Sequence, residues 1–369
     1  MVSIMKVNIA YKFRLYPNKE QESLFSKTFG CTRFIYNKML EDKIRYYELY
    51  NKTYHNTPAM YKGEYEFLKE VDSLALSNVQ LELNRAFQNF FQKRCNYPKY
   101  KSKKHSKLSY TTNNQGGTIK LENGYIKLPK VGLVKIKVHR EIPDYFILKS
   151  ATISKNKAGK YYISILFEYE KQIDEVIPNS FIGLDYSMKE LYVDSLGNTA
   201  DYPKFYRKTI EKLKKEQRKL SKMVIGSNNY KKQKHKINVI YEHITNQRND
   251  FLHKTSRKLV DEYDAIAIED LNMKSLSQCL KFGKSVLDNA WGRFTNMLEY
   301  KLRLLGKKLI KVDKFFASTQ TCNVCGYKNE ETKDLSIRIW ECPNCHTIHD
   351  RDYNSAINIK NEGMKLAYS

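Results

Sequence analysis

The stretch Thr321–Asn358, TCNVCGYKNEETKDLSIRIWECPNCHTIHDRDYNSAIN, holds two different kinds of candidate site. Cys322 and Cys325 form one C-x-x-C pair, and Cys342 and Cys345 form a second pair further along. This spacing is typical of a zinc ribbon, in which two tight turns present four thiolates to one Zn²⁺ ion. Disulfides are the alternative, but nothing else in the chain resembles a secreted protein. We therefore expect a structural zinc site, because four thiolates leave no open position for a substrate.

Two acidic residues, Asp350 and Asp352, follow the second cysteine pair at the expected start of a helix. An acid at this position has an ordinary explanation, because it can cap the first turn and interact favourably with the helix dipole. Capping alone does not explain two further acids, Asp185 and Glu269, which occur elsewhere in the chain beside apolar runs.

Asp185 is expected at the end of a strand in FIGLDYSMKELYVDSLG (residues 181–197), followed by a hairpin partner strand. Glu269 ends the apolar run of residues 265–268. An acid that ends a buried strand costs desolvation free energy unless it faces solvent, a cleft or a metal ion. Together with the acid before the last helix, these residues predict a carboxylate cluster for Mg²⁺, which prefers oxygen ligands. Two such ions can assist phosphodiester hydrolysis.

The composition of the 369-residue chain points to a polyanionic partner, because its net charge is +25 and its pI is about 9.5. Nucleic acid or an anionic membrane would satisfy this charge. No apolar run approaches the length of a membrane span, and no signal peptide is expected. The 28 tyrosines and 17 phenylalanines supply stacking faces for single-stranded nucleic acid. Cys31, Cys95 and Cys279 show no pairing pattern, which favours a reducing cytoplasm.

Several separated motifs resemble those of TnpB, the transposon-encoded, RNA-guided nuclease family that is related to type V CRISPR effectors and often described as OrfB transposase. The motifs are YKFRLYPNKEQ (11–21), FGCTRFIYNK (29–38), GLDYS (183–187), AIAIEDLNM (265–273) and the cysteine pairs followed by HDRDYNSAIN (349–358). The resemblance spans nearly the whole chain, with the motifs in the family's order.

The resemblance implies that Asp185, Glu269 and Asp352 are the catalytic acids and hold two Mg²⁺ ions, while the four cysteines hold a structural Zn²⁺. Asp352 is preferred to Asp350 because the family places its ligand directly before the x-N-x-A segment. Asp350 is then expected to cap the helix or to orient Arg351. The chain departs from the family at His346 and Ser355, where glycine and alanine are common, but neither change removes a ligand.

The implied fold is a multidomain α/β protein with an N-terminal wedge β-barrel, an inserted helical recognition lobe and a split RNase H-like RuvC domain that carries an inserted zinc ribbon. The expected boundaries are residues 1–18 and 96–178 for the barrel, 19–95 for the lobe, 179–316 and 349–369 for the RuvC-like domain, 204–254 for its basic helical hairpin, and 317–348 for the ribbon.

Three regions are candidates for contact with nucleic acid. The first is a helix face with Asn78 and Arg85, and the second is the segment 109–114, whose side chains could read base edges in a groove. The third is the basic hairpin, which could contact an RNA–DNA heteroduplex through its phosphates. From the second and third regions we select Tyr110, Thr112, Asn113, Lys212, Lys215, Arg218, Lys219 and Lys222.

By resemblance, the expected function is cleavage of double-stranded DNA that matches a guide RNA beside a short flanking motif. The expected partners are a guide RNA from the same mobile element and the target DNA, with one protein monomer per RNA and no membrane. The expected location is the bacterial cytoplasm, in association with the nucleoid. The alternatives are a nuclease-inactive, RNA-guided repressor, an unguided RuvC-like nuclease, and a transposase that joins strands.

Overall fold

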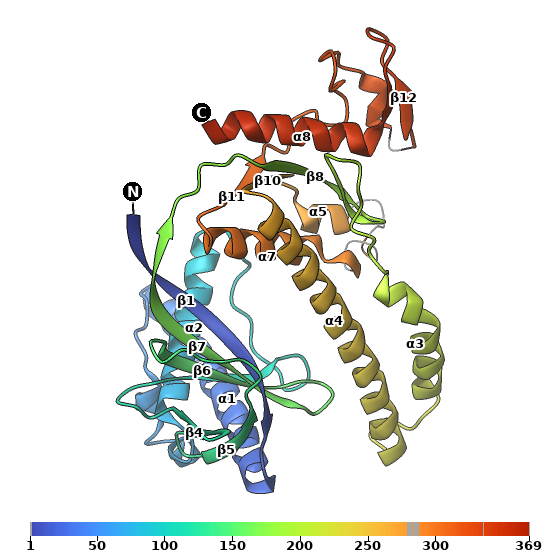
Figure 1. Cartoon of the computed structure of the whole chain (residues 1–369). Helices are drawn as coiled ribbons and strands as arrows, with labels where there is room; N and C mark the ends of the chain where they lie inside the picture. Colours follow the sequence, from blue (N-terminus) through green and yellow to red (C-terminus); the bar gives the residue numbers. More distant parts are fainter. Residues whose placement is uncertain (1, 279–282, 284–287, 335, 369) are drawn as a thin grey trace. The chain divides into compact units, whose positions relative to one another are not determined.

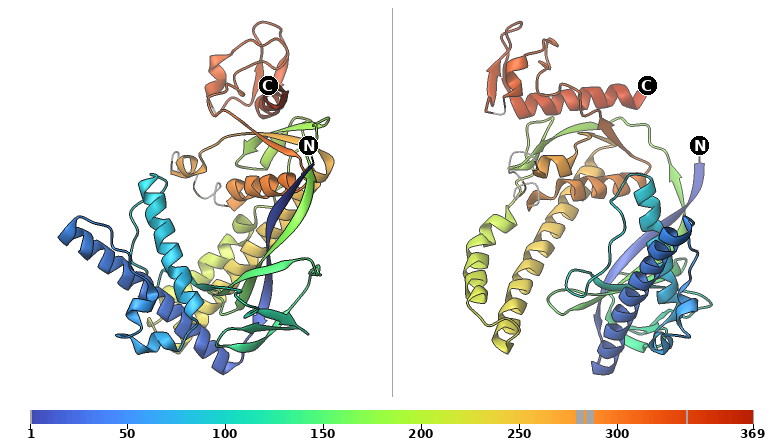
Figure 2. Two further views of the ribbon diagram at one scale, coloured as in Figure 1. Left: turned by 90° about the vertical axis from the view of Figure 1, so that its left-hand side faces the viewer. Right: turned by 180° about the vertical axis from the view of Figure 1, so that it is seen from behind.

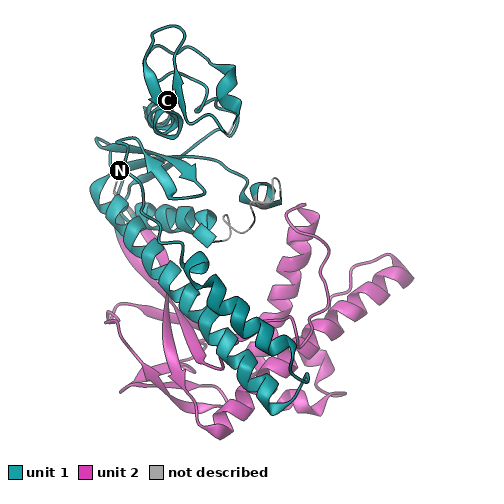
Figure 3. Cartoon of the chain, turned by 90° about the vertical axis from the view of Figure 1, so that its right-hand side faces the viewer, with its two compact units in different colours: residues 1–4, 172–369 teal, residues 5–171 magenta. Residues whose placement is uncertain are grey.

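The computed structural model describes residues 2–278, 283, 288–334 and 336–368, so Cys279 lies outside the described residues. The chain divides into two compact units, which Figure 3 shows in separate colours. Unit 1 comprises residues 1–4 and 172–369, and unit 2 comprises residues 5–171.

Unit 2 is built on a seven-stranded sheet with the strand order β2-β6-β7-β1-β5-β4-β3. The strands are β1 (Val2–Tyr16), β2 (Leu108–Asn113), β3 (Lys120–Glu122), β4 (Tyr125–Leu128), β5 (Gly132–Lys137), β6 (Ile147–Lys155) and β7 (Tyr161–Asp174). Buried and partly exposed residues alternate along the first half of β7, which places Ile163 and Ile165 in an apolar core. The strands expected in this part of the chain are confirmed, whereas closure of the sheet into a barrel stays a prediction.

The helical part of unit 2 contains α1 (Lys19–Tyr50) and α2 (Ser73–Phe91), with short 3₁₀ turns η1 (Pro58–Tyr61) and η2 (Glu66–Lys69) between them. A capping box starts α1, because Asn18 Oδ1 accepts from the Gln21 amide at 2.8 Å and Gln21 Oε1 accepts from the Asn18 amide at 3.1 Å. Asp72 caps α2 by accepting from the Leu74 amide at 3.0 Å. The two helices share a second apolar core.

Unit 1 contains a four-stranded sheet with the strand order β11-β10-β8-β9. Strands β8 (Phe181–Ser187), β10 (Ala265–Glu269) and β11 (Lys308–Val312) are parallel to one another, and β9 (Leu191–Asp194) pairs antiparallel with β8. The central strands are almost continuously apolar, as expected for parallel strands that are covered on both faces. The predicted strand pair after residue 180 and the strand before Glu269 are therefore confirmed.

The helices of unit 1 are α3 (Phe205–Ser221), α4 (Asn228–Glu262), α5 (Met273–Gln278), α7 (Trp291–Arg303) and α8 (Arg351–Tyr368). Helix α8 lies on one face of the sheet and α7 on the other (Figures 1 and 2). Ile182 and Ile266 point to the α4 and α7 side, where they pack with Phe294. The predicted basic hairpin is confirmed as α3 and α4, and α4 continues to Glu262.

The segment between β11 and α8, called the ribbon below, holds the four cysteines for which the sequence predicts a zinc ribbon. It contains a short 3₁₀ turn, η4 (Glu330–Lys333), and an antiparallel pair of strands, β12 (Ile339–Glu341) and β13 (Ile348–Asp350). Trp340 and His349 are directly opposite each other in this pair and are both buried. Strand β13 leads directly into α8, so the ribbon and the last helix are joined without a linker.

Gly183 of β8 allows α8 to approach the sheet closely. A Cβ atom at this position would clash with the Ala356 carbonyl oxygen and would lie 2.6 Å from the Lys360 amide nitrogen. A second close approach occurs where Gly363 of α8 meets the Ala267 side chain of β10. Because both opposing atoms at Gly183 belong to the helix backbone, no side-chain rotation can relieve an added methyl group.

We expect Gly183→Ala to destabilise unit 1 by about 1–3 kcal/mol, or more if the helix is displaced, because overpacking forces backbone shifts. Urea unfolding followed by tryptophan fluorescence measures this change, since both tryptophans, Trp291 and Trp340, lie in unit 1. Gly292→Ala in α7 of unit 1 is the matched control, because its added Cβ would meet only the Met273 side chain, at 4.0 Å. Equal free energies of unfolding for Gly183→Ala and the unaltered chain would contradict the close-packing argument.

Candidate functional site

The four predicted cysteines come together in the ribbon. Their sulfur atoms all lie within 4.8 Å of one another, with Cys322 Sγ 3.7 Å from Cys345 Sγ and Cys325 Sγ 3.5 Å from Cys342 Sγ. Hydrogen bonds from the Asn344 side chain and the Tyr327 backbone lower the pKa of Cys325 to about 6, whereas burial raises the pKa of Cys322. The donor set and its spacing fit a tetrahedral Zn²⁺ site.

The ribbon is fastened to α8 by two buried asparagines. Asn354 Nδ2 donates to the Thr321 carbonyl at 2.8 Å, and Asn354 Oδ1 accepts from the Asn323 amide at 2.9 Å. One turn later, Asn358 Nδ2 donates to the carbonyls of Thr321 at 2.6 Å and Ser318 at 2.8 Å. The first cysteine turn and the helix that follows the second are therefore parts of one hydrogen-bonded structure.

The three predicted acids line one cavity of about 900 Å³ in unit 1. Glu269 is the last residue of β10, as the sequence predicts, and Asp352 is the second residue of α8. The position of Asp185 differs from the prediction, because β8 does not end there but continues to Ser187. Polar residues Tyr186 and Ser187 extend the strand by pairing with β9 through Tyr192 and Leu191, which an apolar run could not reveal.

Asp185 is the most buried of the three acids, with 7% of its surface exposed. Burial, followed by the charges of Glu269 and Asp352, raises the pKa of Asp185 well above its ordinary value. Burial also raises the pKa of Glu269. The three carboxylates thus repel one another across a partly desolvated cavity. Among the described residues, only the four cysteines, and not these acids, form a group of possible metal ligands within 4.8 Å of one another.

Each of the three carboxylates is held by a neighbouring polar side chain. Ser355 Oγ donates to Asp185 Oδ1 at 3.0 Å, and Ser318 Oγ donates to Glu269 Oε1. The Asp352 carboxylate is paired with two arginines, with Arg338 Nη1 2.6 Å from Oδ2 and Arg351 Nη2 3.0 Å from Oδ1. These contacts draw Asp352 toward the ribbon, so the acids converge less tightly than the thiols.

The expected capping role of Asp350 is confirmed, because its Oδ1 accepts from the Tyr353 amide at 2.9 Å at the start of α8. Sequence reasoning missed Ser318 and Arg338. Ser318 could have been found by its place between the last strand of the sheet and the first cysteine. Arg338 carries no comparable signal, because its contact depends on the fold of the ribbon.

Unit 2 contains a cavity of about 430 Å³ that is lined by four of the predicted nucleic-acid contacts, namely Asn78, Arg85, Tyr110 and Asn113. The same cavity is lined by Arg33 and Lys107, so cationic and amide side chains share one hollow. This is the combination of donors that hydrogen-bonds to base edges and phosphates.

Tyr110 and Thr112, which the sequence selects for nucleic-acid contact, are both buried, although Tyr110 also lines the unit 2 cavity. Tyr110 is only 6% exposed and belongs to the apolar core, and Thr112 is 1% exposed and donates its hydroxyl to Asp72. The two residues alternate with Thr111 and Asn113 along β2, so they point to the opposite face of the strand. The run SYTTNN has no alternation of apolar and polar residues, so the sequence does not indicate which face of the strand points inward.

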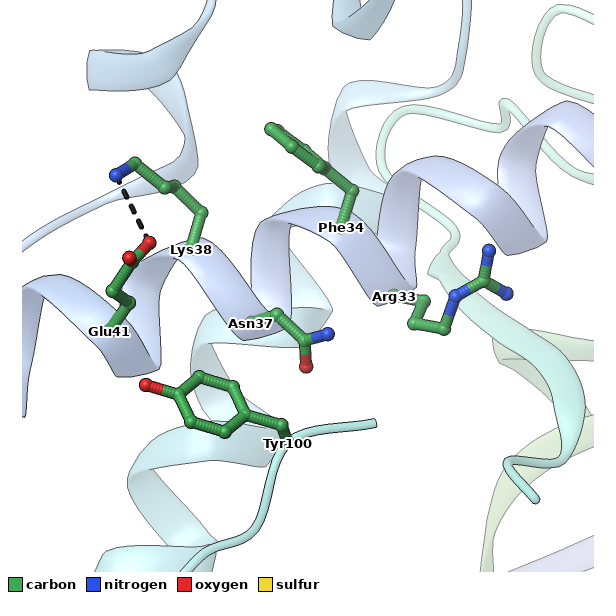
Figure 4. A pocket seen from close by; sticks show the side chains of 6 residues that line it. All are labelled: Arg33, Phe34, Asn37, Lys38, Glu41 and Tyr100. Atoms are coloured by element: carbon green, nitrogen blue, oxygen red, sulfur yellow. Dashed lines mark hydrogen bonds and ion pairs between the residues drawn. The ribbon is translucent and has the colours of Figure 1, made fainter. Parts of the chain in front are cut away.

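A second hollow of unit 2, of about 410 Å³, follows the exposed side of α1 (Figure 4). Asn37 faces Tyr100 there and holds the backbone of Lys101 with two hydrogen bonds of 2.7 and 2.8 Å. The segment 97–104, which has the composition of a solvated linker, is therefore attached to the helix. Lys38 in this hollow is paired with Glu41 at 3.2 Å.

The basic residues selected on α3 are all exposed. Lys212, Lys215, Lys219 and Lys222 recur at spacings of three and four residues, so they follow one side of the helix. The helix is fastened to α4 by buried Glu216, which accepts from Gln233 Nε2 at 2.8 Å and pairs with Lys236 at 3.1 Å. The Gln233, Lys219 and Lys236 hydrogen bonds lower the pKa of Glu216 to about 2.

No helix in the part of the chain that the structure describes is long and apolar enough to cross a membrane.

The geometry defines a class of protein with a carboxylate cavity on an α/β sheet beside a four-cysteine metal centre, and comparisons with known proteins agree with it. A model described as "Helix-turn-helix domain" of OrfB proteins matches residues 5–52, the OrfB_IS605 model "Probable transposase" matches residues 164–280, and a "Cas12f1-like, TNB domain" model matches residues 291–359.

Relatives match over almost the full chain. The "Putative RNA-guided DNA endonuclease" of Streptomyces pristinaespiralis is 35% identical over 98% of this chain and 90% of that protein. The "Putative RNA-guided DNA endonuclease InsQ" of Escherichia coli is 30% identical over 96% of this chain and 92% of that protein. A "TnpB-like protein" of Acanthamoeba polyphaga mimivirus is 24% identical over 97% of this chain and 74% of that protein. The chain belongs to the TnpB family of OrfB-type proteins.

A solved structure shares the fold. The Cas12f1 chain in the cryo-EM structure of the Cas12f1–sgRNA–target DNA complex superposes with a TM-score of 0.62, at 13% sequence identity, and the match covers 96% of this chain and 99% of that chain. At this identity, the likeness concerns the fold alone.

We expect purified protein to contain one Zn²⁺ per chain and Cys342→Ser to contain almost none, because removal of one thiolate opens the tetrahedral site. In isolated zinc peptides the metal contributes about 10–16 kcal/mol, so the variant's ribbon should also become sensitive to protease. Elemental analysis and limited proteolysis measure the two effects. Cys95→Ser, which changes an exposed cysteine of unit 2, should retain the metal. Full zinc occupancy in Cys342→Ser would rule out the four-thiolate site.

Proposed function

We propose that this chain is an RNA-guided, metal-dependent DNA endonuclease of a mobile element, which cuts double-stranded DNA that matches a guide RNA beside a short flanking motif. The observation that carries the proposal is the 35% identity to a protein named as such an endonuclease over 98% of the chain. The retention of all three acids in one cavity supports it, because a repressor that has lost cleavage needs no carboxylate cluster.

The proposed assignment of domains follows the sequence boundaries. Residues 179–316 and 349–369 would form the RuvC-like nuclease, with 204–254 as its basic hairpin, and 317–348 the zinc ribbon. Residues 1–18 and 96–178 would form the wedge, and 19–95 the recognition lobe. The parallel β8, β10 and β11 strands with α8 on one face support the nuclease assignment.

Asp185, Glu269 and Asp352 would hold two Mg²⁺ ions, which when bound supply Lewis acidity and lower the pKa of water for phosphodiester hydrolysis. The chain's own residues orient and balance this site. Ser355 and Ser318 fix Asp185 and Glu269, and Arg351, which is 6% exposed on its side chain, balances Asp352.

Further basic residues of the same cavity provide positive charge for a nucleic-acid backbone. Lys189, Lys204 and Arg207 all line the cavity of the three acids. Neutralising phosphates favours binding of any sequence, so these residues would position the strand and not select it.

Selection of sequence would come mainly from pairing with the guide RNA, by analogy with other RNA-guided effectors. Asn78, Arg85 and Asn113 are the residues that we propose for reading the flanking motif, because they share the unit 2 cavity. We further propose one protein monomer per RNA and a bacterial, nucleoid-associated location.

The test of function is to purify the protein from cells that carry its native flanking DNA and to sequence the bound RNA. We expect a discrete RNA that directs Mg²⁺-dependent cutting of a plasmid with a matching target and randomised flanks, and loss of cutting in Asp185→Ala. RNA-directed binding without cutting would support a repressor. Absence of a specific RNA would refute guidance and favour an unguided nuclease or a transposase.

A separate prediction concerns nucleic-acid binding by the basic face of α3. Replacing Lys212, Lys215 and Lys222 with glutamine should weaken heteroduplex binding and reduce the slope of log affinity against log salt by up to about 0.9 for each lost phosphate contact. Affinity measured at several salt concentrations gives this slope. Lys214→Gln is the control, because Lys214 is paired with Glu211 at 2.7 Å. An unchanged slope in the triple variant would exclude phosphate contact by this face.

A further inference from the structure

Ser355 lies at the contact between α8 and β8, on the same side of the helix as Asp352, which precedes it by three residues. Its side chain is completely buried, and its hydroxyl donates to Asp185 Oδ1 at 3.0 Å. Asp185 is itself only 7% exposed. The hydrogen bond therefore holds one oxygen of the most buried acid of the cavity without competition from bulk solvent.

Ser318 makes the corresponding contact with Glu269. It is 2% exposed, and its hydroxyl donates to Glu269 Oε1. Its own position is fixed at two points, because its amide donates to the Phe316 carbonyl at 2.8 Å and its carbonyl accepts from Asn358 Nδ2 at 2.8 Å. Helix α8 thus supplies one of the two serines and holds the other in place.

A buried carboxylate that binds a cation needs a defined orientation, because rotation about its terminal torsion exchanges the two oxygens. That torsion is broad and roughly two-fold in carboxylate side chains. A hydroxyl donor removes this ambiguity by engaging one oxygen. The second oxygen is then the one that can face the cavity, and the donor also stabilises the charged form of the carboxylate.

We propose that Ser355 and Ser318 are positioning residues, each of which holds one oxygen of Asp185 or Glu269 so that the other oxygen is presented to a divalent cation in the shared cavity. The inference rests on the metal site of the proposed function. It adds two residues that do not bind the cation and that come from separate segments, one before the ribbon and one after it.

Loss of an outer partner of a metal ligand typically costs tenfold to a hundredfold in metal affinity. We therefore expect Ser355→Ala and Ser318→Ala each to weaken Mn²⁺ binding by about this factor. Because the two serines act on different acids, the double variant should combine both losses. The turnover rate at saturating metal should change less than the metal concentration required for half-maximal cutting.

The experiment is Mn²⁺ titration of the full chain, followed by electron paramagnetic resonance, for the unaltered protein, both alanine variants, the double variant and Asp185→Asn. Alanine suits this test because it favours the helix at position 355 and removes only the hydroxyl. Ser318→Thr, which keeps a hydroxyl, should restore much of the affinity. Ser256→Ala is the control for loss of a buried serine, because Ser256 lies on α4 and hydrogen-bonds with Lys301 outside the cavity.

The outcomes separate the inference from the function on which it rests. If the unaltered chain binds Mn²⁺ no better than Asp185→Asn, the metal site of the proposed function fails. If the unaltered chain binds Mn²⁺ and both alanine variants match it, the positioning role is overturned and the function stands. A loss in Ser256→Ala as large as in Ser355→Ala and Ser318→Ala would also overturn it, because the effect would then be general destabilisation.

Discussion

The close contact between α8 and β8 at Gly183 is the constraint on which the carboxylate site depends. The Ala356 carbonyl and the Lys360 amide occupy the space that a Cβ would need, so the helix backbone rests directly on the strand. This approach brings Ser355 to hydrogen-bonding distance of Asp185. If a methyl group at position 183 pushed the helix away from the strand, this hydrogen bond would be lost, because hydrogen bonds weaken steeply beyond their usual distance.

The same helix ties the carboxylate site to the cysteine centre. Asn354 and Asn358 follow one another by four residues on α8 and hold the backbone at Thr321, immediately before Cys322. Ser355 lies between them and faces the sheet. The segment DYNSAIN therefore combines a cavity-lining acid, two ribbon contacts and a serine that holds a second acid. A metal centre with four thiolates contributes no open coordination position, so its effect on the cavity is exerted through the position of this helix.

The sequence was sufficient for the main elements because these depend on local patterns. The three acids line one cavity, but Asp352 was selected over Asp350 by the family resemblance and not by a local pattern. Apolar runs mark β8 and β10, and helical spacing marks α3 and α4. It could not show that β8 continues beyond Asp185, because the strand is extended there by pairing with β9 and not by a run of apolar residues. It also could not show that Tyr110 and Thr112 are buried, since the polar run of β2 has no contrast between its faces. Ser318 and Arg338 escaped because their partners are distant in sequence, and no periodicity links them.

The balance of charge at Asp352 bears on how a cation, if the proposed metal site holds one, would enter the cavity without disrupting the fold. Both carboxylate oxygens are engaged by arginines, but the two arginines differ in their surroundings. The Arg351 side chain is 6% exposed, whereas that of Arg338 is 58% exposed. An exposed ion pair contributes about 0–1 kcal/mol and is screened by salt, so Asp352 Oδ2 can exchange Arg338 for another positive charge at small cost. The buried pair with Arg351 keeps the carboxylate in place while that exchange occurs, because breaking a buried pair leaves an uncompensated charge.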